Sequence, residues 1–244
     1  MTTVDDFLGG KVHLKQAEKG LRATSDSVLV AAAVPARVGD SILDVGTGNG
    51  VIALCLNARI KDLKITGVDC QKELLQLAAK NAKANECNLK TVLMDIGERP
   101  PPLHGQQFHH VVTNPPFYDE PRPRADQEQD IAYHQKVSLT EWLRFCLRHV
   151  RAKGSLSVIA RAVSLLEILN ALEPKLGALE VFPIASKAGD PASRIIVRGR
   201  MNSRQKLKLY PPLVMHEEDG CRTETAEKLL RQGMSIDAVK GLDI

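Results

Sequence analysis

Strand-type and helix-type segments alternate along most of this chain of 244 residues. Short runs rich in apolar and β-branched residues predict seven strands, at 41–46, 63–69, 90–94, 108–113, 155–160, 179–184 and 194–197. Longer runs predict helices between them, at 51–59, 71–85, 138–150 and 163–172. This alternation favours a single-domain α/β fold, with a Rossmann-like, doubly wound, mostly parallel seven-stranded sheet and helices on both faces.

The composition argues against several other classes of protein. The chain has no run of 18 apolar residues to cross a membrane, and its acidic segment 1–10 resembles neither a secretory signal nor a transit peptide. The five cysteines are scattered without a C-x-x-C pair, and the seven histidines show no metal-ligand spacing. We therefore expect a cytoplasmic protein with reduced thiols, no metal and no membrane contact.

Unusual residues follow four of the predicted strands at their carboxyl ends. These positions are segment 44–50, Asp69, Asp95 and segment 114–117. Parallel strands bring their carboxyl ends to one edge of a sheet, and doubly wound sheets bind ligands beyond that edge. The sequence therefore predicts one ligand site built from these four segments.

The first segment, 44–50, reads D-V-G-T-G-N-G. Glycine lets the backbone turn sharply and approach a ligand closely, although a plain strand-to-helix turn has the same composition. A nicotinamide fingerprint, G-x-G-x-x-G, needs glycine where Val51 stands, and the lysine of a phosphate-binding P-loop is missing. The remaining pattern, Asp44 followed by Gly46, Gly48 and Gly50, is that of S-adenosylmethionine (SAM) methyltransferases.

Two further acids fit the same cofactor. Asp69 ends the second predicted strand, where a carboxylate accepts hydrogen bonds from both ribose hydroxyls of a nucleoside. Asp95 ends the third strand, placed to accept from an adenine amine while Ile96 packs on the ring. Each acid alone has an ordinary reading as a solvated strand-end residue or a helix N-cap. Their common register behind the glycine loop favours SAM.

Segment 114–118, N-P-P-F-Y, ends the fourth predicted strand. A proline-rich turn explains the two prolines alone, but not the preceding Asn114 and the two following aromatic residues. A conjugated amine is a poor nucleophile because its lone pair is delocalised. Carbonyl oxygens of the Asn114 side chain and the Pro115 backbone hold its N–H groups and aim the lone pair. Phe117 stacks on a planar substrate, worth about 1–3 kcal/mol per base, and Tyr118 adds to substrate binding.

With these motifs, the chain resembles class I SAM-dependent methyltransferases that carry an N-P-P-[FYW] loop. That group includes adenine-N6 and guanine-N2 nucleic-acid methyltransferases and release-factor glutamine methyltransferases. Segments 8–29, 133–143 and 211–220 are similar to the tRNA(Val) anticodon-loop adenine-N6 methyltransferase family, so the resemblance covers nearly the whole chain. It implies the class I methyltransferase fold and an RNA substrate, with tRNA favoured.

The resemblance also implies a division of the chain. Residues 1–40 form an N-terminal hairpin and helix leading into the cofactor site, 41–200 the SAM-dependent core, and 201–244 a C-terminal extension of the same domain. Ser25 and Asp26 then lie over the SAM pocket, although Leu21, Thr24 and Ser25 depart from the family pattern. A helix N-cap in segment 25–27 is the plainer reading of the same residues.

The net charge of +4 is small, but it is unevenly distributed. Residues 121–210 hold 16 Lys and Arg against 8 Asp and Glu, while the rest of the chain is slightly acidic. Arg122 and Arg124 follow the N-P-P-F loop, and we expect them to bind the substrate. A second basic run is expected to line the RNA backbone path toward Asn114: Arg194, Arg198, Arg200, Arg204, Lys206 and Lys208.

The prediction is therefore a SAM-dependent N-methyltransferase acting on an exocyclic amine, with adenine N6 in tRNA favoured. Guanine-N2 methylation of rRNA and glutamine N-methylation of a protein remain alternatives within the enzyme class. A catalytically silent RNA-binding module with the same fold is the non-enzyme alternative. A nicotinamide oxidoreductase is disfavoured because Val51 stands where the third glycine is needed.

Overall fold

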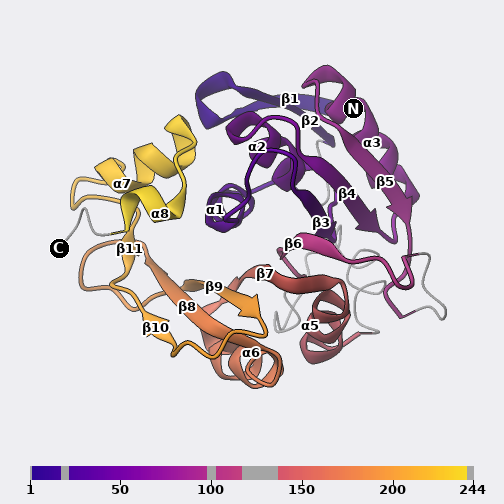
Figure 1. Cartoon of the computed structure of the whole chain (residues 1–244). Coiled ribbons are helices and arrows are strands. Elements are labelled where there is room, and N and C mark those ends of the chain that lie inside the picture. The colour runs from indigo at the N-terminus through magenta and orange to yellow at the C-terminus, as the bar shows by residue number, and fades with distance from the viewer. Residues whose placement is uncertain (1, 18–21, 98–102, 117–136, 241–244) are drawn as a thin grey trace.

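A computed structural model describes residues 2–17, 22–97, 103–116 and 137–240 of the chain (Figure 1). Its main sheet contains the seven expected strands: β3 (Ser41–Val45), β4 (Lys64–Asp69), β5 (Leu89–Leu93), β6 (Phe108–Thr113), β7 (Val150–Arg161), β8 (Leu176–Ala185) and β9 (Arg194–Met201). Two short strands, β10 (Lys208–Leu209) and β11 (Leu213–Val214), both pair with β8 and were not predicted. The strand order is β10-β8-β9-β7-β6-β3-β4-β5.

The sheet is mostly parallel, as predicted. Strands β3 to β7 run parallel to their neighbours, whereas β9 runs antiparallel to both β7 and β8. The strand order reverses direction at β3, which has β4 on one side and β6 on the other. That reversal places the ends of β3, β4 and β6 side by side at the edge where a doubly wound sheet binds its ligand.

Helices cover both faces of the sheet, because successive strand residues point to opposite sides. On one face, Ile42 and Val112 pack in a core with α1 (Ser25–Ala33), α2 (Val51–Arg59) and α8 (Ile236–Val239). On the other face, Leu43 and Val111 pack with α5 (Leu139–Arg148) and α6 (Leu165–Leu172). The remaining helical segments are η1 (Leu8–Gly10), α3 (Lys72–Ala84), η2 (Ala162–Ser164), α7 (Glu224–Glu227) and η3 (Lys228–Gln232).

The N-terminal segment forms a separate antiparallel hairpin of β1 (Thr2–Phe7) and β2 (Val12–Ala17). Strand β2 lies beside α3, and Asn81 of that helix connects the hairpin to the glycine loop. The Asn81 side-chain amide donates to the backbone oxygens of Lys15 at 2.9 Å and Asn49 at 3.0 Å. The hairpin is thereby fixed against the loop that follows β3.

Candidate active site

The glycine loop after β3 takes a conformation that other residues adopt with strain. Gly46, Gly48 and Gly50 have φ values of 73°, 53° and 89°, in the left-handed region. The backbone N–H of Gly46 donates to the oxygen of Val68 at 2.9 Å, which ties the loop to β4. A Cβ atom on Gly46 would lie 3.0 Å from Cζ2 of Trp142. The glycine is therefore required both by the turn and by the close approach of α5.

Asp44 is the least exposed acid of the site. Its side chain is completely buried, and Oδ2 accepts a hydrogen bond from the Thr47 hydroxyl at 2.7 Å. Oδ1 is buried without a hydrogen-bond partner among the described residues. Burial, together with the negative charge of Asp69, raises the pKa of Asp44 to about 7, although the Thr47 hydrogen bond opposes the shift. A buried acceptor of this kind is suited to a donor on a bound ligand.

Asp69 lies where the sequence predicts, at the end of β4, and its carboxylate links two loops. Oδ2 accepts from the backbone N–H of Gly48 at 2.9 Å, and Oδ1 accepts from that of Gln71 at 2.9 Å. These bonds hold the carboxylate in one orientation against the glycine loop.

One cleft brings together four of the predicted cofactor residues. Gly46, Asp69, Asp95 and Ile96 line about 380 Å³ of empty space. The cleft is completed by Val68, Cys70, Met94, Val137 and Trp142. Asp95 lies two residues beyond the end of β5, and its Oδ1 accepts from the backbone N–H of Gly97 at 2.9 Å. The mixture of apolar walls and fixed carboxylates fits a nucleoside.

Asn114 follows β6, directly beside the glycine loop, since Thr113 pairs with Val45 in the sheet. The side-chain oxygen of Asn114 is buried and has no hydrogen-bond partner among the described residues. Pro115, the next residue, is also buried. An amide oxygen held without a partner at this edge is a ready acceptor for a substrate N–H.

Two residues that the sequence reasoning missed hold Asn114 in place. The Trp142 indole N–H donates to the Thr113 hydroxyl at 2.9 Å, and that hydroxyl donates to the backbone oxygen of Val45 at 2.8 Å. This relay joins α5, β6 and β3 at the base of the site. The single tryptophan of the chain, on a predicted helix after the N-P-P-F motif, was the available signal.

The N-terminal hairpin reaches the site through Gln16, which is 2% exposed. Its side-chain oxygen accepts from the Asn49 amide at 3.3 Å and from the backbone N–H of Ala23 at 2.9 Å. Gln16 was not predicted as a site residue, because nothing local in the sequence indicates its burial. Gln16 therefore connects the hairpin to the glycine loop and to the residues just before α1.

Ser25 and Asp26 begin α1, and their surroundings differ from one another. Ser25 is exposed, whereas the Asp26 carboxylate accepts from Arg194 Nε at 3.0 Å. The predicted N-cap in segment 25–27 is wrong, because Thr24 occupies that position and makes no side-chain capping bond.

The predicted residues Phe117, Tyr118, Arg122 and Arg124 lie outside the described part of the structure.

The prediction that the basic run 194–208 lines a path to Asn114 is wrong for Arg198, Arg200, Lys206 and Lys208, whereas Arg194 lies at the same edge of the sheet as Asn114. Strand β9 is antiparallel to β7, so Arg194 lies opposite Arg161 and Arg200 opposite Ser155. Six residues of strand span about 20 Å, which takes Arg200 to the opposite edge of the sheet from Asn114.

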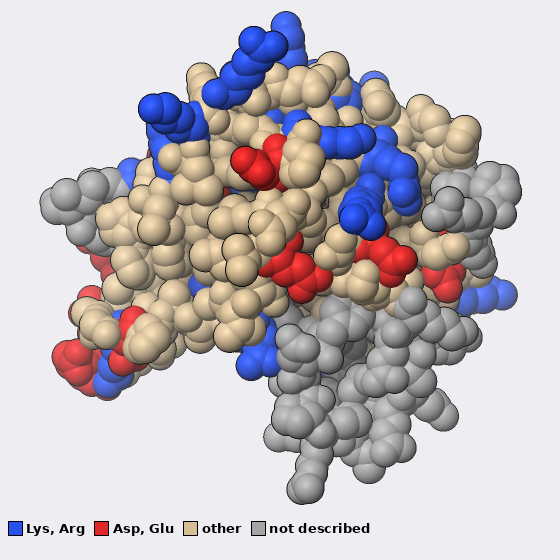
Figure 2. Space-filling view, turned by 90° about the horizontal axis from the view of Figure 1, so that it is seen from below, with Lys and Arg blue, Asp and Glu red and all other residues tan. Residues whose placement is uncertain are grey.

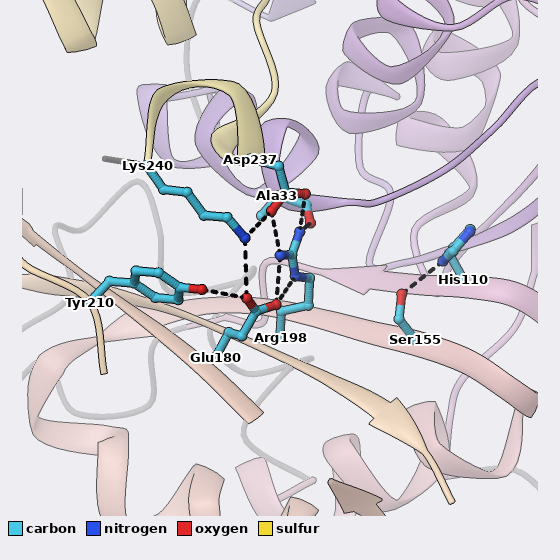
Figure 3. Close-up of polar contacts among 8 residues, drawn as sticks. All are labelled: Ala33, His110, Ser155, Glu180, Arg198, Tyr210, Asp237 and Lys240. Atoms are coloured by element: carbon cyan, nitrogen blue, oxygen red, sulfur yellow. Dashed lines mark hydrogen bonds and ion pairs between the residues drawn. The ribbon is translucent and has the colours of Figure 1, made fainter. Parts of the chain in front are cut away.

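Arg198 is not available to RNA at all, because it is 6% exposed and paired within the protein. Its guanidinium donates to Glu180 at 2.6 Å and to Asp237 at 2.7 Å, and also to the backbone oxygen of Ala33 (Figure 3). Burial acts to raise the pKa of Asp237, but the hydrogen bonds and positive charges of Arg198 and Lys240 together outweigh it and lower that pKa to about 2. Arg198 is therefore a structural residue that holds α8 and α1 to the sheet.

Comparison with known proteins shows to which family of enzymes this chain belongs. The family model for the methyltransferase small domain matches residues 22–185. The chain is 23% identical over 234 residues to the tRNA1(Val) (adenine(37)-N6)-methyltransferase of Actinobacillus pleuropneumoniae, covering 95% of this chain and 98% of that protein. It is 36% identical over 98 residues to the release factor glutamine methyltransferase of Escherichia coli, covering 40% of this chain and 34% of that protein.

Among solved structures, a predicted O-methyltransferase from Agrobacterium tumefaciens has a TM-score of 0.71 at 25% identity, covering 86% of this chain and 97% of that one. The fold is that of a class I methyltransferase, which confirms the predicted fold class, and the family match confirms the predicted enzyme class. More narrowly, the chain belongs to the methyltransferase small domain family.

No helix in ranges 2–17, 22–97, 103–116 and 137–240 is long and apolar enough to cross a membrane. Within the same ranges, no group of three or more His, Cys, Asp or Glu is placed to hold a metal ion. All five cysteines lie in these ranges, and none of them is in a disulfide.

Proposed function

We propose that this protein transfers a methyl group from SAM to the N6 amine of an adenine in RNA, with a tRNA as the favoured substrate and the cytoplasm as its compartment. The observation that carries the proposal is the Asn114 side-chain oxygen. It is buried, lacks a partner among the described residues and adjoins the glycine loop at the edge formed by β3 and β6.

The residues of the cleft suit SAM as the cofactor. SAM supplies an electrophilic methyl group on a sulfonium. Asp44 and the loop of Gly46, Gly48 and Gly50 form one end of its site, where the unpartnered Oδ1 of Asp44 accepts a donor. Asp69 would hold the ribose hydroxyls, while Asp95 and Ile96 would hold the adenine. The assignments of Asp69, Asp95 and Ile96 rest on the cleft that these residues share and on the fixed orientation of the Asp69 carboxylate.

The substrate amine needs orientation more than a strong base. The Asn114 oxygen accepts one amine N–H, and the backbone oxygen of Pro115 is proposed to accept the other. Both bonds favour a pyramidal nitrogen with its lone pair directed at the methyl group. The amine releases its proton after transfer, when it is more acidic. Phe117 is proposed to stack on the base, and Tyr118, Arg122 and Arg124 to contact the RNA.

The comparisons favour adenine N6 over the rival substrates. The adenine-N6 relative aligns with 95% of the chain, whereas the glutamine methyltransferase shares 98 residues, a third of its own length. The motif residues alone do not separate adenine N6 from guanine N2. The substrate therefore has to be read directly from the modified nucleoside.

The test uses the full chain with isotopically labelled SAM and total RNA, followed by nucleoside analysis. We expect label in N6-methyladenosine; label only in protein, or only in N2-methylguanosine, would overturn the proposed substrate. Asn114→Ala is expected to lower kcat by about 10²–10³-fold while SAM affinity stays within about twofold. Asn170→Ala, at an exposed position of α6, is the matched control and should leave both unchanged.

A further inference from the structure

A second concave surface lies at the opposite edge of the sheet from Asn114. It is a groove with about 1120 Å³ of empty space, formed where β6 and β7 begin and β9 ends. His110, on its wall, and Asn114 lie four residues apart along β6, a distance of about 13 Å. Besides the buried Arg198, six exposed cations line this surface, which is called the basic groove here: Arg37, Arg151, Lys153, Arg200, Lys206 and Lys208.

The charge of the basic groove is not compensated within the described protein. All six side chains belong to exposed residues, and none has a carboxylate oxygen within 4.0 Å among the described residues. The two acids that line the groove each bond to a neighbour that is not one of the six cations. Asp40 contacts His110 at 3.1 Å, and Glu180 contacts Arg198 at 2.6 Å. Figure 2 shows the same unevenness on one face of the molecule, where Lys and Arg gather in the upper part of the view.

The floor of the groove is polar and ordered. His110 Nδ1 lies 2.7 Å from the Ser155 hydroxyl (Figure 3). Its Nε2 lies 3.1 Å from the Asp40 carboxylate. Ser155 is 6% exposed. This hydrogen-bonded floor fixes the starts of β6 and β7, from which the cations project.

Backbone irregularities shape both sides of the groove. The β6–β7 register shifts between Phe108 and His110, and Lys153 takes a φ of 63° there. The β8–β9 register shifts between Gly177 and Glu180, and Ala178 takes a φ of 48°. Left-handed conformations of residues with a Cβ cost free energy, and bulges concentrate beside functional surfaces. Here they expose segment 151–153 at the groove.

We propose that the basic groove is a second RNA-binding surface, which holds the phosphodiester backbone of the substrate away from the methylated base. The RNA identity of the ligand rests on the proposed function, whereas the groove itself does not. Six exposed cations spread along an open groove suit a chain of phosphates better than a single anion. A folded tRNA carries many phosphates outside the loop that holds the methylated base, whereas a short stem-loop carries few of them. The surface therefore contributes to affinity rather than to chemistry.

The experiment compares two triple variants of equal charge change. R151Q/K206Q/K208Q removes three cations of the basic groove, and K72Q/K80Q/K83Q removes three exposed cations of α3. Binding of total tRNA and of a stem-loop oligonucleotide of about 17 nucleotides is measured across salt concentrations. The groove variant should weaken tRNA binding about 10- to 100-fold and reduce the salt slope by about 2–3, because each lost phosphate contact contributes about 0.7–0.9. Stem-loop binding, SAM binding and kcat at saturating RNA should stay near wild type.

The outcomes separate this inference from the proposed function. If the wild type methylates RNA but both triple variants bind tRNA alike, the groove inference fails and the proposed function stands. If the groove variant alone loses tRNA binding and no RNA is methylated by the wild type, the proposed function fails and the groove inference stands. Competition by millimolar inorganic phosphate as effective as tRNA, or preference for an acidic protein over RNA, would overturn the groove inference.

Discussion

The buried carboxylate of Asp44 makes the stability of this protein depend on pH in a calculable way. Burial and the charge of Asp69 raise its pKa from 3.8 to about 7 in the folded state. A raised acid pKa means that the folded protein prefers the protonated form. Between pH 3.8 and 7, stability is therefore lost as pH rises, because the unfolded chain ionises this group freely and the folded one does not.

Asp44→Asn removes that penalty while keeping the shape of the side chain. One pKa unit corresponds to about 1.4 kcal/mol, so we expect the variant to be more stable than wild type by about 4 kcal/mol at pH 8 and by about 2 kcal/mol at pH 5. The Thr47 hydroxyl keeps an acceptor in the variant, since an amide oxygen replaces the carboxylate oxygen. SAM affinity is expected to fall at the same time, because the ionised acceptor is lost from the proposed site.

Urea unfolding at both pH values measures the free energies, and calorimetry with SAM measures the affinity. Asp95→Asn is the matched control, since Asp95 is another carboxylate of the candidate site but is only half-buried. It should change the free energy of unfolding by less than about 1 kcal/mol. A stability gain for Asp44→Asn that is equal at pH 5 and pH 8, or no gain at either pH, would refute the reasoning.

Two further predictions concern the support of the site and the packing of the C-terminal segment. Trp142→Phe keeps an aromatic ring beside Gly46 but removes the hydrogen bond to Thr113. We expect kcat to fall about 10-fold in single-turnover kinetics, and urea unfolding to show a stability loss of about 1 kcal/mol. An unchanged kcat would count against a role for this hydrogen-bond relay in the site. Arg198→Ala removes a buried guanidinium and leaves Glu180 and Asp237 with Lys240 as their remaining cation, so it should cost about 2–3 kcal/mol of unfolding free energy, whereas the exposed Arg200→Ala should cost less than about 0.5 kcal/mol. Equal losses in the two arginine variants would contradict the buried pairing.

Much of the sheet was predictable because its signals are local. Helix α2 was predicted at its observed bounds, and six of the seven main strands overlap their predicted ranges to within about four residues at each end. Strand β7 begins at Val150, five residues earlier than predicted, because the bulge around Lys153 places exposed residues inside the strand. An exposed, basic stretch carries no alternating pattern, so nothing local indicates a strand there.

The candidate site was predictable only in part. Asp69, Asp95 and Asn114 follow strands that local patterns already indicate, so their common edge could be inferred. Gln16, Thr113 and Trp142 belong to the site through contacts between segments far apart in the chain. No spacing or composition marks such contacts before the helices and the hairpin are packed.

The sequence by itself determined which residues stand at the carboxyl ends of the parallel strands, because strand period and glycine turns are properties of neighbouring residues. Only the tertiary structure decided where the positive charge lies. The antiparallel direction of β9 carries Arg200 away from Asn114, and the packing of α8 buries Arg198 between Glu180 and Asp237. Strand direction and helix docking depend on the whole packed core, so a basic run that is continuous in sequence is divided between two edges and an interior.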